Sequence, residues 1–274
     1  EDSNLSPADV KAHWPEVAAA MQKELETWHK LNCISRKERR IARNIIDVRW
    51  VYKWKLDRET LSAEDSVAGL VAKVIRVIRA RLCLRGFKDL DKDNVASYAG
   101  TSSRWSQRIL CSEAVVRGWD IATTDISKAF LQGVTYKELA EMTGEPLREV
   151  NFQLPHYCLP FLRKIPGWES FDPRTECIHC DKPGTGCNDA PRCFSIKLAK
   201  VTQELCKMNS CTMDNELCFL HDSADSSCAS GRRQSEPDDQ LGGDRKIEPD
   251  DQLESEGLVP KLSNRKVKKL YAIL

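Results

Sequence analysis

The residues best suited to chemistry lie between Gly118 and Gly133, in the stretch GWDIATTDISKAFLQG. Its first half alternates between two faces, as a half-buried β-strand does. Asp125 would then end the mostly apolar face that begins with Trp119, a few residues before Phe130. A carboxylate at the end of a strand suits divalent-metal binding and phosphoryl transfer. The alternative is a strand that ends in a solvated aspartate at the start of a turn.

Three sequence motifs occur in an order that is typical of a known family. They are IRARLCLRGFKD at 78–89, TTDISKAFLQG at 123–133 and GTGCNDAPRCFSIKL at 184–198. They resemble the reverse transcriptase of copia-type LTR retrotransposons, which typically reads KARLVARGF, DVKTAFLNG and GLKQAPRAW at comparable spacing. The resemblance covers about Val48 to Phe219. It implies a partial fingers and palm domain of an RNA-directed DNA polymerase.

The resemblance also implies the partners and several roles. The family uses Mg²⁺ or Mn²⁺, a primer–template of RNA and DNA, and deoxynucleoside triphosphates. Asp125 matches the first metal-binding, catalytic carboxylate, and Ile126 supplies the adjacent backbone position of the metal site. Phe130 matches the aromatic residue that closes off the 2′ side of the sugar. Arg79 and Arg81 match basic positions that meet the incoming nucleotide or the template.

Four further positions are implied to contact nucleic acid: Arg85, Gly186, Pro191 and Arg192. The last three belong to the turn and helix that help to position primer–template and nucleotide in the family. Cys187, Asn188 and Asp189 replace the usual Leu-Lys-Gln of that turn. Loss of the lysine weakens the expectation of a nucleic-acid contact there.

The family also needs an Asp-Asp pair in an apolar strand, and the sequence lacks one beyond the last motif. Asp238–Asp239 and Asp250–Asp251 lie in a tandem EPDDQL repeat at 236–241 and 248–253, within a Ser-, Asp- and Gly-rich stretch. Such a composition predicts disorder, which cannot hold metals rigidly. We therefore expect a catalytically incomplete polymerase fragment. The alternative is a nucleic-acid-binding remnant without catalysis.

The predicted fold class is α+β, with antiparallel sheets covered by helices and followed by a disordered tail. Strands are expected near 48–56, 77–85 and 119–126. The expected organisation is an N-terminal helical extension over 1–47, the polymerase part over 48–221 and the tail over 222–274. The final basic stretch, 261–270, is read as a short helix or simply as part of the tail.

Capping residues and apolar spacing predict four helices. One begins after Ser6 and continues into an apolar stripe of Val17, Met21, Leu25 and Trp28. A second runs from Ser102 or Ser103 to Arg117, and a third from the capping box at Thr135 to Gly144. Asp189 is expected to cap the fourth, whose buried stripe would be Phe194, Leu198, Val201 and Leu205.

The net charge of +1 conceals a local excess of cations. Between Lys73 and Lys88 the chain has six basic residues and no acidic one. Alternation places Arg79, Arg81 and Arg85 on one strand face, where guanidinium groups match phosphate oxygens. A merely solvated edge strand is the alternative.

Twelve cysteines offer a different hypothesis. Cys177, Cys180, Cys187 and Cys193 could form a zinc-binding module, although the second pair is spaced wider than is usual. The chain has no apolar run long enough to cross a membrane and no signal-peptide pattern, so we expect an intracellular protein with reduced thiols. The start at Glu1 rather than Met suggests a fragment.

Overall fold

The structure is a computed structural model, and it describes residues 3–59, 73–123, 125–221 and 267–272. The chain divides into two compact units. Unit 1 comprises 1–100 and 123–201, and unit 2 comprises 101–122 and 202–274. Both units combine helices with mainly antiparallel strands, so the α+β class is confirmed. Residues 3–47 belong to the same compact unit as the strands that follow them.

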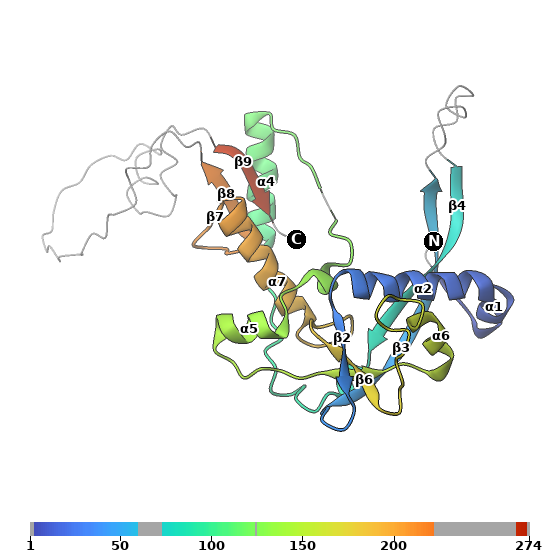
Figure 1. The fold of residues 1–274 in the computed structure, drawn as a ribbon. Coiled ribbons are helices and arrows are strands. Elements are labelled where there is room, and N and C mark those ends of the chain that lie inside the picture. The colour runs from blue at the N-terminus through green and yellow to red at the C-terminus, as the bar shows by residue number, and fades with distance from the viewer. Residues whose placement is uncertain (1–2, 60–72, 124, 222–266, 273–274) are drawn as a thin grey trace, which may run out of the picture. The chain divides into compact units, whose positions relative to one another are not determined.

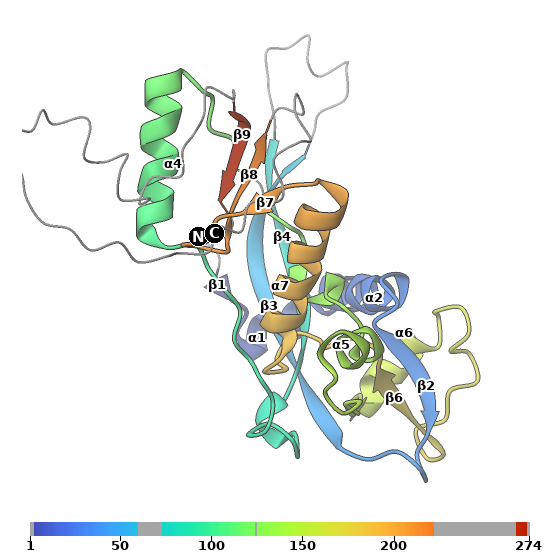
Figure 2. The same ribbon diagram turned by 90° about the vertical axis from the view of Figure 1, so that its left-hand side faces the viewer.

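Unit 1 is built around a mixed sheet. Its strands are β1 (Ser3–Asn4), β2 (Ile34–Glu38), β3 (Ile45–Glu59), β4 (Lys73–Leu84), β5 (Asn151–Gln153) and β6 (Glu176–Cys180). The order is β1-β3-β5-β6-β2, and β4 pairs with β3. Only β3 and β5 run parallel among these pairs. The predicted strands at 48–56 and 77–85 are confirmed as β3 and β4, which form a long two-stranded ribbon (Figures 1 and 2).

Helices α1 (Pro7–Ala12) and α2 (Trp14–Lys30) lie between β1 and β2 in the chain, and α2 packs against β4. The predicted stripe of Val17, Met21, Leu25 and Trp28 is completely buried. Burial of each such side chain contributes about 1.5–3 kcal/mol of hydrophobic free energy. The same core contains the inward-facing residues of the ribbon, among them Val48, Trp50, Leu82 and Leu84.

The remaining helices of unit 1 are α5 (Tyr136–Thr143), α6 (Leu159–Leu162) and α7 (Ala190–Lys200). Thr135 forms the predicted capping box with Glu138, and Gly144 ends α5 in the left-handed conformation, at φ 71°. Asp189 holds the N-cap position of α7, but its side chain makes no capping hydrogen bond. The predicted stripe of α7 is also wrong: Leu205 is 75% exposed, and the buried residues are Ala190 and Cys193.

Unit 2 contains α4 (Arg104–Arg117) and the strands β7 (Asn209–Ser210), β8 (Leu217–His221) and β9 (Val267–Ala272), in the order β7-β8-β9. Ser103 caps α4 and Gly118 ends it at φ 64°, as predicted. The end of the basic C-terminal stretch forms β9, so its interpretation as a helix or tail is wrong over these residues. The EPDDQL repeats and the predicted disordered tail over 222–266 lie outside the described residues.

The strand predicted at 119–126 is wrong. The described residues of this segment have no regular secondary structure, and Ile121 is 55% exposed. The chain passes here from unit 2 to unit 1. Alternating residue types do not form a strand without a neighbouring strand to accept their backbone hydrogen bonds.

Candidate nucleic-acid interface

Five cationic side chains lie on one face of the β3–β4 ribbon. Paired residues of an antiparallel ladder share a face, and the register pairs Val51 with Arg81 and Lys53 with Arg79. Alternation adds Arg49 and Lys55 of β3 to the same face. We call Arg49, Lys53, Lys55, Arg79 and Arg81 the cationic face; all five are exposed.

The cationic face has excess charge. Lys53 and Arg79 lie directly opposite each other in the register. Arg49, Lys53, Lys55 and Arg81 form no ion pair with any residue that the structure describes. An anion placed on this face would neutralise these four side chains, and guanidinium groups fit phosphate oxygens particularly well.

The opposite face of the ribbon fixes which side meets solvent. Val48 pairs with Leu84 and Trp50 with Leu82, and all four side chains are buried in the core of unit 1. A shift of one residue in the register would bury the cations and expose this apolar set, so the register is strongly specified.

One acidic residue, Asp47, neutralises two cations that follow the end of β4. Asp47 pairs with Arg85 at 3.1 Å and with Lys88 at 2.8 Å. The hydrogen bond from Lys88, together with the nearby Arg85, lowers the pKa of Asp47 against a smaller effect of burial. Arg85, predicted to contact nucleic acid, therefore has an internal partner, whereas Arg81 has none among the described residues.

Asp125, Ile126 and Phe130 lie on the surface of unit 1. Asp125 is exposed in an irregular segment, Ile126 is 39% exposed, and Phe130, in the short 3₁₀ helix Ala129–Gln132, is 38% exposed. Among the residues that the structure describes, no group of three or more His, Cys, Asp or Glu side chains is placed to hold a metal ion. Asp125 therefore belongs to no such group within the described ranges.

The segment that carries these residues is held by an ion pair that the sequence did not reveal. Lys128 adopts the left-handed conformation, at φ 55°, and contacts the carboxylate of Glu24 on α2. That carboxylate is buried and also accepts a hydrogen bond from Trp28 Nε1 at 3.2 Å. The position of Glu24 inside the apolar stripe of α2 was the available signal, since a buried acid requires a partner.

Gly186, Pro191 and Arg192 are engaged within the fold. A Cβ atom on Gly186 would lie 2.2 Å from the carbonyl oxygen of Leu84, and its φ is 101°. Pro191 lies in the first turn of α7, and Arg192 donates two hydrogen bonds of 2.9 Å to Glu145. These contacts explain the residue types by packing. The predicted nucleic-acid contact at these three residues stays a prediction.

A second buried ion cluster was also missed by the sequence. Arg148 pairs with Asp89, and its Nε lies 2.7 Å from Asp189 Oδ2; all three side chains are at most 9% exposed. Asn44 donates to Asp89 at 2.9 Å. Burial raises the pKa of Asp189, and Arg148 opposes that effect. The cluster explains why Asp189 does not cap α7.

The four cysteines of the zinc hypothesis do not form a thiolate site in the described structure. Cys177 and Cys180 are three residues apart on β6, so they point to opposite faces of the strand. Burial raises the pKa of Cys187 to about 12 and that of Cys193 to about 12. Zinc binds the thiolate, which such burial disfavours.

No helix in the described ranges is both long enough and apolar enough to cross a bilayer. No protein-family model matches the chain, and the search found no significant match among curated proteins or solved structures. The interpretation of function therefore depends on the three sequence motifs and on the geometry described above.

Proposed function

We propose that the chain is part of a copia-type retrotransposon RNA-directed DNA polymerase that binds a primer–template through the cationic face but does not extend it. The observation that carries this proposal is the excess of cations on one solvent-facing side of the β3–β4 ribbon. Positive charge of this kind attracts the phosphate backbone independently of base sequence.

The order of the three motifs supports the same proposal. Arg79 and Arg81 of the first motif lie within the cationic face, so the motif that matches the fingers of the family contributes two exposed cations to that face. Phe130 of the second motif is partly exposed, as a residue that meets a sugar must be. Unit 1 holds all of these residues.

The proposed absence of catalysis follows from the lack of a complete set of metal-binding carboxylates. Nucleotide addition with two metals requires acidic oxygens from more than one element around the same point. Asp125 is exposed, and in the described part of the chain it belongs to no group of three or more side chains that could hold a metal ion. Cations of Arg and Lys can neutralise phosphates without any metal, so binding does not need the missing groups.

Two assays on the full chain and on Asp125→Asn test the proposal. Fluorescence anisotropy with a labelled RNA–DNA primer–template should show binding that weakens as salt increases. Asp125→Asn should bind equally well or slightly better, because it removes one negative charge. A primer-extension assay with Mg²⁺ or Mn²⁺ should give no product with either protein. Extension by the unaltered chain that Asp125→Asn abolishes would reveal a complete metal site, and salt-independent binding would refute the cationic face as the interface.

A further inference from the structure

Helix α4 of unit 2 leaves a row of apolar side chains exposed. Trp105, Ile109 and Val116 lie on one side of the helix, because they are separated by four and by seven residues. They are 71%, 53% and 81% exposed. The buried residues of α4, Ser106 and Ala114, lie on another side, and α4 contacts β9 (Figures 1 and 2). We call the three exposed residues the apolar row; exposed apolar patches of this kind mark interaction surfaces.

A second row on the same helix carries cations. Arg104, Arg108, Cys111 and Val115 follow one another at spacings of four, three and four residues, and all four are exposed. The Arg108 guanidinium lies over the Trp105 ring, 5.3 Å from its centroid. The cationic row and the apolar row are therefore adjacent and form one surface.

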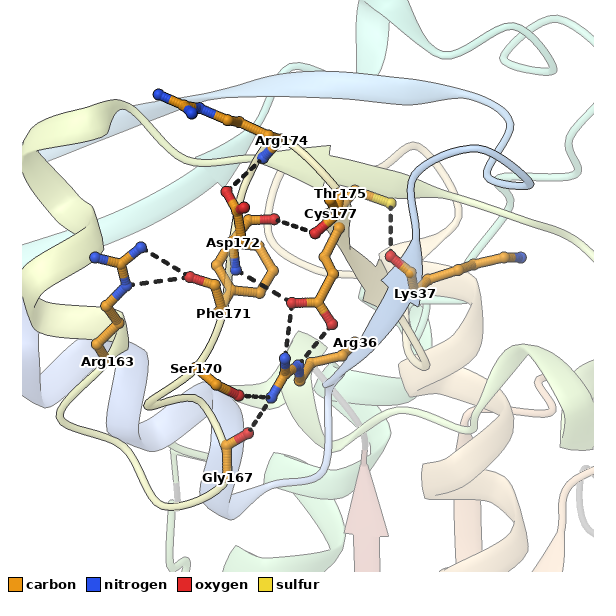
Figure 3. A network of polar contacts seen from close by, with 11 residues as sticks. Arg36, Lys37, Arg163, Gly167, Ser170, Phe171, Asp172, Arg174, Thr175 and Cys177 are labelled. Atoms are coloured by element: carbon orange, nitrogen blue, oxygen red, sulfur yellow. Dashed lines mark hydrogen bonds and ion pairs between the residues drawn. The ribbon is translucent and has the colours of Figure 1, made fainter.

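Arg104 and Arg108 form no ion pair with any residue in the described ranges. Arg36 of β2 shows the contrast. It donates through Nε and Nη2 to Glu176, at 2.9 and 2.7 Å, and through Nη1 to the carbonyl oxygen of Gly167 at 3.0 Å (Figure 3). Two guanidinium groups without a carboxylate partner, beside an apolar row, favour an occupant that combines carboxylates with apolar side chains.

The chain contains a segment of this chemistry. Residues 222–266, which lie outside the described ranges, connect β8 to β9. Positions 222–257 include eleven acidic and four basic residues. Each of the two EPDDQL repeats combines three acids with one leucine. Since β9 contacts α4, the segment is joined directly to a strand that lies beside the exposed surface.

We propose that the acidic segment 236–253, which contains both repeats, docks on α4, with carboxylates on Arg104 and Arg108 and leucines on the apolar row. The length of the chain allows this contact. Fourteen residues lead from Leu253 to Val267 and can span up to about 46 Å, whereas the fourteen residues of α4 span about 21 Å.

A segment of the same chain suits this surface better than a second copy of α4 does. The second copy would bring further arginines, and the one acid of α4, Glu113, is already paired with Arg117 at 2.6 Å. Like charges placed against each other oppose association. A segment within the chain also acts at an effective concentration of up to about millimolar, so that weak contacts are sufficient.

Cys111 reports on this surface, because it follows Arg108 in the cationic row. Alkylation of the full chain with iodoacetamide, measured for each cysteine by mass spectrometry, gives the accessibility of its thiol. An effective concentration of about 1 mM and a dissociation constant of about 0.5 mM would slow alkylation of Cys111 about threefold. Cys206 is the internal control, since it is an exposed cysteine of unit 2 that lies outside α4.

The first variant removes four acids of the repeats. Its substitutions are Asp238→Asn, Asp239→Asn, Asp250→Asn and Asp251→Asn. In this variant Cys111 should be alkylated about threefold faster than in the unaltered chain, and the rate at Cys206 should not change. Equal rates at Cys111 in the two proteins would overturn the proposal.

The second variant, Arg104→Gln with Arg108→Gln, tests the surface itself. Loss of two nearby cations lowers the thiolate fraction of Cys111 and by itself slows alkylation. Release of the acidic segment has the opposite effect, so faster alkylation of Cys111 would report that the segment has left α4. Arg40→Gln with Lys137→Gln, two exposed cations of unit 1, is the matched control and should leave the rate at Cys111 unchanged.

Two further results would contradict the docked segment. Unchanged or slower alkylation of Cys111 in the Arg104→Gln, Arg108→Gln protein would show that these arginines do not hold it. Protection of Cys111 that increases with protein concentration would place a second copy of the chain on α4 in its stead.

Discussion

Glu24 and Lys128 show how one pair of residues can hold a candidate functional segment. The Glu24 side chain is only 2% exposed, and Lys128 provides its cation from a left-handed backbone position three residues after Asp125. A buried charge that loses its partner is costly. The ion pair therefore links the surface position of Asp125 and Phe130 to the core helix α2.

Lys128→Met should consequently lower the free energy of unfolding by about 2 kcal/mol, because Glu24 would stay buried without its cation. Urea denaturation of the full chain measures this change. Lys137→Met is the control: Lys137 is also a lysine of unit 1, its side chain is 82% exposed, and its loss should change stability by less than about 0.5 kcal/mol. Equal effects of the two substitutions would show that the ion pair does not stabilise the fold.

At the scale of single residues, the environment of Glu149 predicts that the stability of the fold depends on pH. Burial alone would raise its pKa, but Lys37, the Arg43 amide and Asn151 together lower the pKa to about 2 from the ordinary value of 4.5. Because the folded pKa is the lower one, ionised Glu149 stabilises the protein above pH 4.5, and that contribution is lost as the pH falls towards 2.

Glu149→Gln should therefore be less stable than the unaltered chain at pH 7, and the difference should shrink in acid. Thermal unfolding at several pH values measures it. Glu16→Gln, at an exposed site in α2, is the control, and it should change stability at pH 7 by less than about 0.5 kcal/mol. A destabilisation by Glu149→Gln that is the same at pH 7 and pH 3 would contradict this explanation.

At the scale of elements, the sequence predicts what depends on local chemistry. The caps at Ser103 and Thr135, the apolar stripe of α2 and the alternation of β3 follow from neighbouring residues alone. The predictions of a strand at 119–126 and of the buried stripe of α7 were wrong because burial there depends on elements far away in the chain. The ion clusters of Glu24 and Arg148 were not predicted for the same reason, since each joins segments that are distant in sequence.

Gly186 lies at a close contact between two segments that are distant in the sequence, the turn before α7 and the end of β4. Gly186→Ala should lower the free energy of unfolding by about 3 kcal/mol, because the added Cβ would meet the Leu84 backbone in a conformation that is itself strained. Gly144→Ala is the control, since its φ is also positive but nothing lies within 4 Å of the added atom. That substitution should cost only about 1 kcal/mol, from backbone strain. Urea denaturation of both variants gives the comparison, and equal costs would show that the approach to β4 is not tight.

At the scale of the molecule, the proposed function depends on where the charges lie rather than on the shape of the fold. The net charge of the whole chain is +1, yet the ribbon of unit 1 places the five cations of the cationic face on one exposed side. Composition alone did not show this arrangement; the register of β3 and β4 did. The three motifs resemble those of a polymerase, and the proposed binding of a primer–template depends on the cationic face rather than on metal-binding carboxylates.

The most direct test is the salt dependence of primer–template binding, measured by anisotropy between about 50 and 200 mM salt. If about four cations of this face contact phosphates, the logarithm of the binding constant should fall with a slope of about −4 against the logarithm of salt concentration. Lys53→Gln with Arg81→Gln should reduce that slope by about 2, whereas Arg40→Gln with Lys137→Gln, also two exposed cations of unit 1, should leave it unchanged. The account predicts this difference between the two double variants, and equal slopes would contradict it.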